Sequence, residues 1–252
     1  MNKRSLLKAL VSTAILALAP SVTNAQHQAH WEYRGDNGPS NWGNLDTSYT
    51  LCSTGHAQSP IDIRHAEKSN LPALQFDYKS VPLNIVDNGH TIQVNYAAGS
   101  TLISGDKSYT LKQFHFHHPS EEHVNGHSYD MVAHLVHADS EGHPAVVAVL
   151  FSIGETNAFI DSVWKNIPRE KQKPIEVSAV TINVGDLLPR DHSYYTFGGS
   201  LTTPPCSEGV TWYVLKNPVP ISRDQLAAFA TLYPMNARPI QPLNGRQILD
   251  SQ

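Results

Sequence analysis

The sequence lacks long apolar runs, an excess of basic residues and internal repeats. Beyond residue 25, no stretch approaches the 18 consecutive apolar residues typical of a membrane-spanning helix, so no membrane span is expected. The 18 Lys and Arg are outnumbered by 22 Asp and Glu, giving a formal net charge of −4, which argues against nucleic acid as a partner. Without a low-complexity linker, charge block or repeat, the chain is expected to form one domain.

The one apolar segment of note lies at the N-terminus. Lys3, Arg4 and Lys8 precede an apolar core at residues 10–19, and the small-residue sequence TNA ends at Ala25. This order is typical of a secretory signal peptide, and the apolar core is too short to cross a bilayer. Residues 1–25 are therefore predicted to be removed, leaving an exported domain at residues 26–252. Loss of its three cationic residues would change the net charge from −4 to −7.

Cysteine is scarce, with only Cys52 and Cys206 in the chain. In a cytosolic protein these would be two unrelated buried thiols. In an exported chain an even pair more often forms a disulfide, which we expect here.

Short apolar segments separated by turn residues dominate the rest of the chain. Most are β-branched or aromatic and several alternate with polar residues, which indicates the strands of an antiparallel sheet. They span residues 83–96, 100–105, 108–118, 131–138, 145–154 and 209–217. Residues 157–167 and 222–232 have helical spacing, with Ser222 as a candidate N-cap, and residues 26–60 have no period and indicate an irregular loop. The predicted fold is mainly β, a large twisted and mostly antiparallel central sheet with a few short peripheral helices.

The histidine-rich segments QFHFHHPSEEH (113–123) and HLVH (134–137) carry the strongest functional signal. In a strand, residues i and i+2 share a face, so His115 and His117 project together while Phe114 and Phe116 are buried on the other side. A hairpin or meander would bring His134 alongside this pair. Three imidazoles converging from two strands form the ligand set of a catalytic zinc ion that keeps its fourth position for water.

Other interpretations of these histidines are open from the residues alone. An HxH pair in a chain with 14 histidines can arise by chance or lie on the surface. A cupin-like oxygenase also uses HxH, a glutamate (here Glu121 or Glu122) and a histidine on a later strand, although Tyr109 stands where such proteins have a glycine. A third possibility is a non-catalytic binding module on the same fold.

Across nearly all of residues 26–252 the chain resembles the α-class carbonic anhydrases of the bacterial exported kind. The segments that carry the resemblance are HWEYRGDNGPSNWG (30–43), QSPIDI (58–63), NGH (88–90), the two histidine segments, GSLTTPPCSEGVTW (199–212) and RPIQPLNGRQ (238–247). The resemblance implies reversible hydration of CO2 to bicarbonate and a proton, by attack of a zinc-bound hydroxide. It also implies a periplasmic location; a monomer and a homodimer both stay open.

The resemblance assigns roles to individual residues. His115, His117 and His134 would bind Zn2+. Thr202 would accept a hydrogen bond from the nucleophile and pass its own proton's hydrogen bond to Glu122, and Thr203 would border bicarbonate; an ordinary Pro-rich turn is the alternative for this segment. An apolar wall for CO2 would consist of Val136, Val147, Leu201, Val210 and Trp212, each of which could equally be plain core.

His90 matches the family's proton shuttle, and the alternative is an ordinary turn histidine. Recombination of a proton with its base runs at roughly 10¹⁰ M⁻¹s⁻¹. For a group with a pKa near 7, this rate constant multiplied by about 10⁻⁷ M limits direct proton release to roughly 10³ s⁻¹. A faster enzyme needs a side chain that titrates near pH 7, which is histidine. Tyr33, Asn88 and Gln93 would organise intervening waters, and Gln113 would orient the His115 ring.

One position departs from the family pattern. The family usually has a glutamate two residues before the third zinc histidine, where it orients that ring. This chain has Val132 there, so the position and tautomer of His134 must be fixed by another group.

Overall fold

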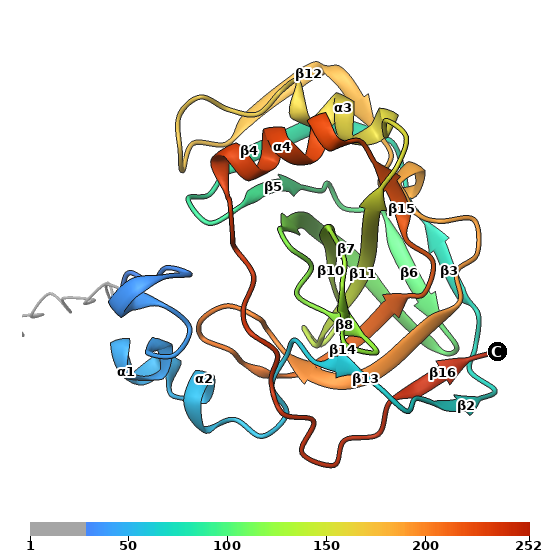
Figure 1. The fold of residues 1–252 in the computed structure, drawn as a ribbon. Coiled ribbons are helices and arrows are strands. Elements are labelled where there is room, and N and C mark those ends of the chain that lie inside the picture. The colour runs from blue at the N-terminus through green and yellow to red at the C-terminus, as the bar shows by residue number, and fades with distance from the viewer. Residues whose placement is uncertain (1–28) are drawn as a thin grey trace, which may run out of the picture.

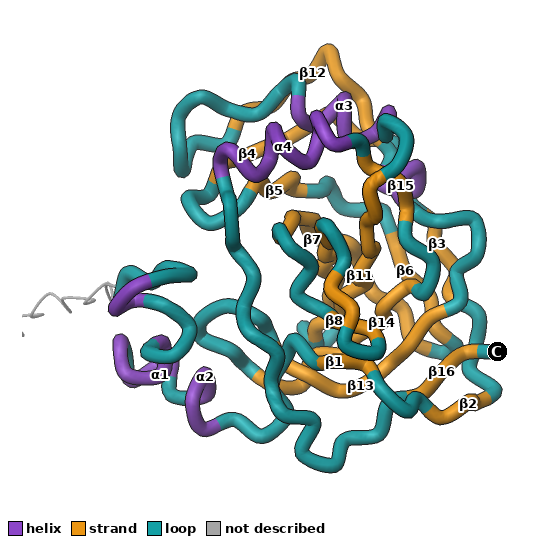
Figure 2. Tube along the Cα trace, viewed as in Figure 1, coloured by secondary structure: helices purple, strands orange, loops and turns teal. Residues whose placement is uncertain are grey.

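The computed structural model describes residues 29–252, and the predicted signal peptide at residues 1–25 lies outside the described part. Strands dominate, with short helices at the periphery (Figures 1 and 2). Among the described residues, no helix is long and apolar enough to cross a membrane.

One large sheet organises the molecule. Thirteen strands belong to it, with the main path β12-β4-β5-β7-β10-β11-β14-β13-β16-β2. Their bounds are β2 Glu67–Ser69, β3 Leu74–Asp77, β4 Val81–Asp87, β5 Ile92–Asn95, β6 Thr101–Ser104, β7 Lys107–His117, β10 Met131–Ala138, β11 Pro144–Ile153, β12 Ile175–Ile182, β13 Tyr194–Ser200, β14 Glu208–Leu215, β15 Val219–Ile221 and β16 Leu249–Ser251. A small second sheet contains β1 (Asp62–Ile63), β8 (His123–Val124) and β9 (His127–Ser128).

Most pairings in the large sheet are antiparallel, as predicted. The exceptions are β11 with β14, β11 with β15, and β16 with β2, which pair in parallel and make the sheet mixed. Strands β7, β10 and β11 lie near the middle of the molecule (Figure 1). A strand with neighbours on both sides has its backbone groups paired and its position fixed, which suits it to hold a precise site.

Both faces of the central strands are buried, which explains why β10 and β11 are nearly continuous apolar runs. Alternate residues contribute to two different clusters. Phe114, Phe116 and Leu135 belong to the main core, whereas Val132 and Trp212 belong to a second cluster on the opposite face. The prediction that Phe114 and Phe116 are buried behind the histidines is confirmed.

Two predicted helices form where expected. Helix α3 (Ala158–Trp164) begins after Asn157, whose side chain accepts hydrogen bonds from the first turn. Helix α4 (Arg223–Leu232) begins after Ser222, which forms a capping box with Gln225. The two helices lie side by side (Figure 2), and Trp164 stacks on Phe229.

The N-terminal segment is more ordered than its sequence indicates. It contains two short α-helices, α1 (Trp42–Leu45) and α2 (Leu51–Thr54), and two 3-10 turns at Gly35–Asn37 and Thr47–Tyr49. Turns of three or four residues are too short to show a helical period, so the pattern could not reveal them. The predicted disulfide between Cys52 and Cys206 is present and holds this segment to the loop after β13.

Candidate metal centre

Strands β7 and β10 bring the three predicted histidines together. In the antiparallel register His115 lies opposite His134, and His117 is two residues further along β7 on the same face. One nitrogen from each ring lies within 4.8 Å of the other two, in an arrangement able to hold a metal ion. The chain returns from β7 to the adjacent antiparallel strand β10, so the predicted placement of His134 beside the first two histidines is confirmed.

A hydrogen-bond acceptor fixes the second nitrogen of each ring. His115 Nδ1 lies 2.8 Å from Gln113 Oε1, the partner expected for it. His117 Nδ1 lies 2.7 Å from the backbone oxygen of Asn236. His134 Nε2 lies 3.0 and 3.2 Å from the two carboxylate oxygens of Glu122. A ring that donates N–H to an acceptor leaves its other nitrogen free as a ligand, so all three rings are set in a metal-binding tautomer.

The nitrogens that face one another are suited to a metal ion. His117 Nε2 is buried and has no hydrogen-bond partner among the described residues. Burial, with a contribution from His134, lowers the pKa of His115 to about 3 and that of His117 well below its usual range. These two imidazoles are therefore neutral at physiological pH, as metal ligands must be. Although burial lowers the pKa of His134, the Glu122 carboxylate outweighs it and the net pKa is raised.

The carboxylate beside Thr202 is Glu121 rather than the expected Glu122. The Thr202 hydroxyl lies close enough to Glu121 to lower its pKa, although Glu121 Oε2 has no fully formed hydrogen bond among the described residues. Glu121 Oε1 accepts a 2.7 Å hydrogen bond from the backbone N–H of Arg238. Burial nevertheless raises the pKa of Glu121 to about 7. The prediction that Thr202 bonds Glu122 is therefore wrong. The side chains of Glu121 and Glu122 point in different directions, and Glu122 contacts His134.

Four of the five residues predicted to form an apolar wall lie together on the histidine face. Val210 and Trp212 belong to the apolar cluster on the histidine face, and Val136 and Leu201 pack against it. Trp212 also lies edge-on to His134, with ring centroids 4.9 Å apart.

Val147 is not part of this wall. It lies opposite Leu135 and belongs to the core on the other side of the sheet. Val146, opposite Val136, takes the expected place on the histidine face. The prediction was one residue out of register, and in a strand such a shift places a side chain on the opposite face.

His90 lies in the turn between β4 and β5 and is half-buried. Its ring stacks on Trp31, with centroids 3.7 Å apart and planes 8° from parallel. Burial, followed by the nearby His30, lowers its pKa below the usual 6.5. Of the residues expected to organise water, Asn88 donates a 3.2 Å hydrogen bond to Gln93.

Tyr33 is the third of those residues. Burial of its hydroxyl and the charge of Glu121 raise its pKa well above the usual range, although the ring stays partly exposed. Thr203, which was expected to border bicarbonate, is half-buried in the loop after β13, where its carbonyl accepts the N–H of Cys206 at 2.8 Å.

Two residues of the site gave no usable sequence signal. Asn236 contacts His117 through its backbone oxygen, and its side chain bonds the backbone oxygens of Phe116 and His90. Arg238 holds Glu121 through a backbone N–H. Both are more than 100 residues from their partners, and a backbone contact does not depend on residue type.

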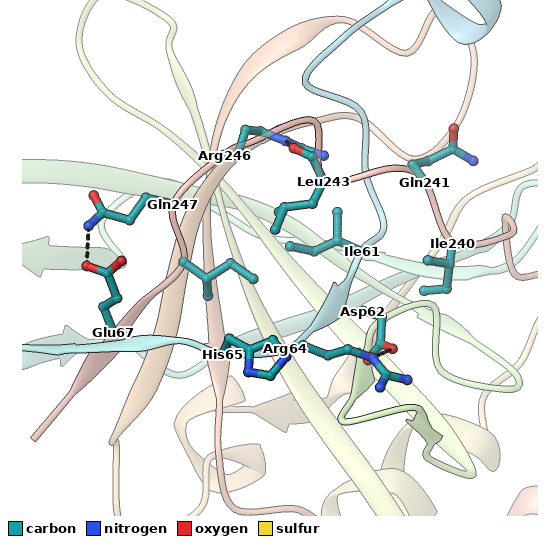
Figure 3. Close-up of a pocket in the computed structure, with 11 residues that line it drawn as sticks. Ile61, Asp62, Arg64, His65, Glu67, Ile240, Gln241, Leu243, Arg246 and Gln247 are labelled. Carbon is teal, nitrogen blue, oxygen red and sulfur yellow. Dashed lines mark hydrogen bonds and ion pairs between the residues drawn. The ribbon is translucent and has the colours of Figure 1, made fainter.

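A separate surface cavity of about 420 Å³ contains none of the predicted site residues (Figure 3). Its lining includes Ile61 and Leu243, and another pair of lining residues is joined by a 2.7 Å hydrogen bond from Gln247 to Glu67. The Arg246 guanidinium beside it already donates to the backbone oxygens of Gln58, Gly198, Pro242 and Leu243. The residues that line this cavity are different from those of the metal centre.

Comparison with known proteins identifies the family and agrees with the fold. The family model for eukaryotic-type carbonic anhydrase matches residues 37–252. A carbonic anhydrase from Neisseria gonorrhoeae is 43% identical over 243 residues, which cover 94% of this chain and 96% of that protein.

Solved structures of carbonic anhydrases superpose closely on this one. A hyperthermostable carbonic anhydrase from a hydrothermal vent chimney gives a TM-score of 0.86 at 44% identity, covering 88% of this chain and 100% of that one. The α-carbonic anhydrase of Thermovibrio ammonificans, solved with the inhibitor sulfanilamide, gives 0.84 at 43% identity, covering 88% and 99%. The chain belongs to the α-class carbonic anhydrase family and is an enzyme of that class.

Proposed function

We propose that the protein binds one Zn2+ ion through His115, His117 and His134 and hydrates CO2 reversibly to bicarbonate and a proton. The observation that carries this proposal is the set of three inward nitrogens within 4.8 Å, with each outer nitrogen already bonded. Three imidazoles are the ligand set of a catalytic zinc site with an open position, and each ring binds the metal through an unprotonated nitrogen. In carbonic anhydrases bound zinc lowers the pKa of a water ligand to about 7, which supplies a hydroxide nucleophile at neutral pH.

Thr202 and Glu121 would orient the nucleophile. The backbone N–H of Arg238 donates to Glu121 Oε1, and the Thr202 hydroxyl lies beside the same carboxylate. When the Thr202 hydroxyl donates a hydrogen bond to Glu121, the lone pairs of Thr202 Oγ1 are left to accept a hydrogen bond from the nucleophile. This fixes the direction in which the nucleophile can attack.

The apolar wall would hold CO2 beside the histidines. Carbon dioxide has no net charge, so it is retained by a surface from which water is excluded. Val136, Val146, Leu201, Val210 and Trp212 form that surface. Thr203 would contact bicarbonate at the edge of this wall.

His90 would carry the proton away. Its half-buried ring stacks on Trp31 near the exposed His30, so it sits between the interior and solvent. Asn88, Gln93 and Tyr33 provide polar groups for water between His90 and the histidines. We further propose export to the periplasm, supported by the predicted signal peptide and by a disulfide, which suits an oxidising compartment.

The test is substitution of a ligand with a matched control on the neighbouring strand. His117→Ala should no longer bind one zinc ion per chain and should lose CO2-hydration activity, because two imidazoles cannot retain a catalytic zinc ion. His137→Gln is the control, since His137 is also buried but contacts Tyr78 Oη at 2.8 Å on the other face of β10. The control should keep its zinc, and full activity in His117→Ala would refute the proposal.

A further inference from the structure

The third ligand histidine lacks an orienting partner on its own strand. Val132 precedes His134 by two residues and therefore shares its face, but its side chain has no hydrogen-bonding group. Val132 is fully buried in the apolar cluster that includes Trp212. A ligand imidazole needs an acceptor at its outer nitrogen to fix its tautomer.

Glu122 reaches the same ring from a different element. It lies in the segment between β7 and β8, and both carboxylate oxygens contact His134 Nε2, at 3.0 and 3.2 Å. The side chain is fully buried, and its carboxylate has no other hydrogen-bond partner among residues 29–252. Because an isolated buried carboxylate is costly, Glu122 depends on His134 as much as the ring depends on the carboxylate.

The backbone around Glu122 is fixed at several points. The Ser120 hydroxyl donates to the backbone oxygen of Glu122 at 2.8 Å and accepts the N–H of Tyr129 at 2.8 Å. His123, the next residue, donates its N–H to Ile61 at 3.3 Å. The segment is therefore tied both to the connection between β9 and β10 and to the residue before β1, which gives its carboxylate a defined position.

We propose that Glu122 is the positioning residue for His134, replacing from a loop the acceptor that Val132 cannot provide on the strand. Glu122 accepts Nε2–H and so leaves Nδ1 as the metal ligand. Its neighbour Glu121 accepts the backbone N–H of Arg238 and lies beside Thr202. Glu121 Oε2 also lies 3.9 Å from His134 Nδ1, which is beyond hydrogen-bond distance, so of the two glutamates only Glu122 hydrogen-bonds the ring. This inference rests on the proposed zinc site.

The experiment moves the acceptor between the two positions and measures zinc loss to a chelator. Glu122→Ala should lose zinc about 10- to 100-fold more readily, equivalent to about 1.4–2.7 kcal/mol. Glu122→Gln should lose zinc less readily than Glu122→Ala, because its amide oxygen can still accept a hydrogen bond from His134 Nε2–H. The exposed Glu155→Ala removes the same charge elsewhere and should match wild type.

The relocation variants separate positioning from general stability. Val132→Glu alone should not slow zinc loss, because two buried carboxylates would compete for one N–H. Val132→Glu combined with Glu122→Ala should recover part of the affinity lost in Glu122→Ala. NMR of the zinc-loaded proteins should show a hydrogen-bonded His134 Nε2–H in wild type and Glu122→Gln, and none in Glu122→Ala.

The outcomes are distinguishable. If wild type binds zinc but Glu122→Ala loses it no faster than Glu155→Ala, the positioning role is refuted. It is also refuted if the Nε2–H signal is unchanged in Glu122→Ala, or if Val132→Glu alone slows zinc loss. If Glu122→Ala fails to fold, the test rests on Glu122→Gln. Loss of the His134 Nε2–H signal when zinc is added to Glu122→Gln would then overturn the inference. A wild-type protein that takes up no zinc would instead refute the proposed function.

Discussion

Removal of the Cys52–Cys206 disulfide should lower the stability of the whole protein substantially. The two cysteines are 154 residues apart, so the bridge restricts most of the unfolded chain. Loop-closure entropy for a separation of this size corresponds to about 5 kcal/mol, an upper figure because strain and residual structure reduce it. For a protein of this length, 1 kcal/mol shifts the melting temperature by about 2–4 °C. The expected decrease is therefore as large as about 10–20 °C.

The bridge should also affect the site. Arg238 Nη2 donates to the backbone oxygen of Cys52 at 3.0 Å, and the Arg238 backbone N–H holds Glu121. Cys206 closely follows Thr202 in the chain, so both sides of the Thr202–Glu121 contact are linked to the disulfide. Its loss should therefore lower activity at temperatures where the protein is still folded.

The assay is urea unfolding of the Cys52→Ala/Cys206→Ala variant beside wild type, both loaded with zinc. Wild type treated with a reductant serves as a second comparison and should show a similar loss. A difference in the free energy of unfolding below about 1 kcal/mol would refute the entropic reasoning. Unchanged activity at moderate temperature would refute the link to the site.

Two further predictions concern the wall and the shuttle. Val146→Phe should lower kcat/KM for CO2 while zinc is retained, whereas Val147→Phe should lower thermal stability by overpacking the opposite core, typically by 1–3 kcal/mol; the reverse pattern would contradict the assignment of faces. His90→Ala should slow proton transfer, with rescue by imidazole buffer, and leave CO2–bicarbonate interconversion intact; buffer dependence equal to wild type would exclude His90. Because burial lowers the pKa of His90, an NMR titration should place its midpoint below 6.5.

The sequence predicted features that depend on local pattern. Short apolar runs bounded by turn residues located the central strands. The i, i+2 rule placed His115 and His117 on one face with the two phenylalanines behind them. Helical spacing located both peripheral helices, and Ser222 was identified as the cap of α4, whereas the cap at Asn157 was found only in the structure. These features need no knowledge of distant contacts.

The sequence could not reveal features set by register and by long-range contacts. Val146 and Val147 are chemically identical, so only strand pairing decides which one faces the histidines. Glu121 and Glu122 are likewise adjacent and chemically identical. Their hydrogen-bond partners differ because the turn after β7 directs the two side chains differently. The contact of Asn236 with His117 uses a backbone oxygen, which any residue could supply.

The central claim is tested most directly by measuring zinc content and CO2 hydration together on the same mature protein. Stopped-flow hydration should be fast in protein with about one zinc per chain, vanish when a chelator removes the metal, and return in proportion to zinc added back. Equal hydration rates in the zinc-free and zinc-loaded protein, with the chain folded in both, would contradict the account.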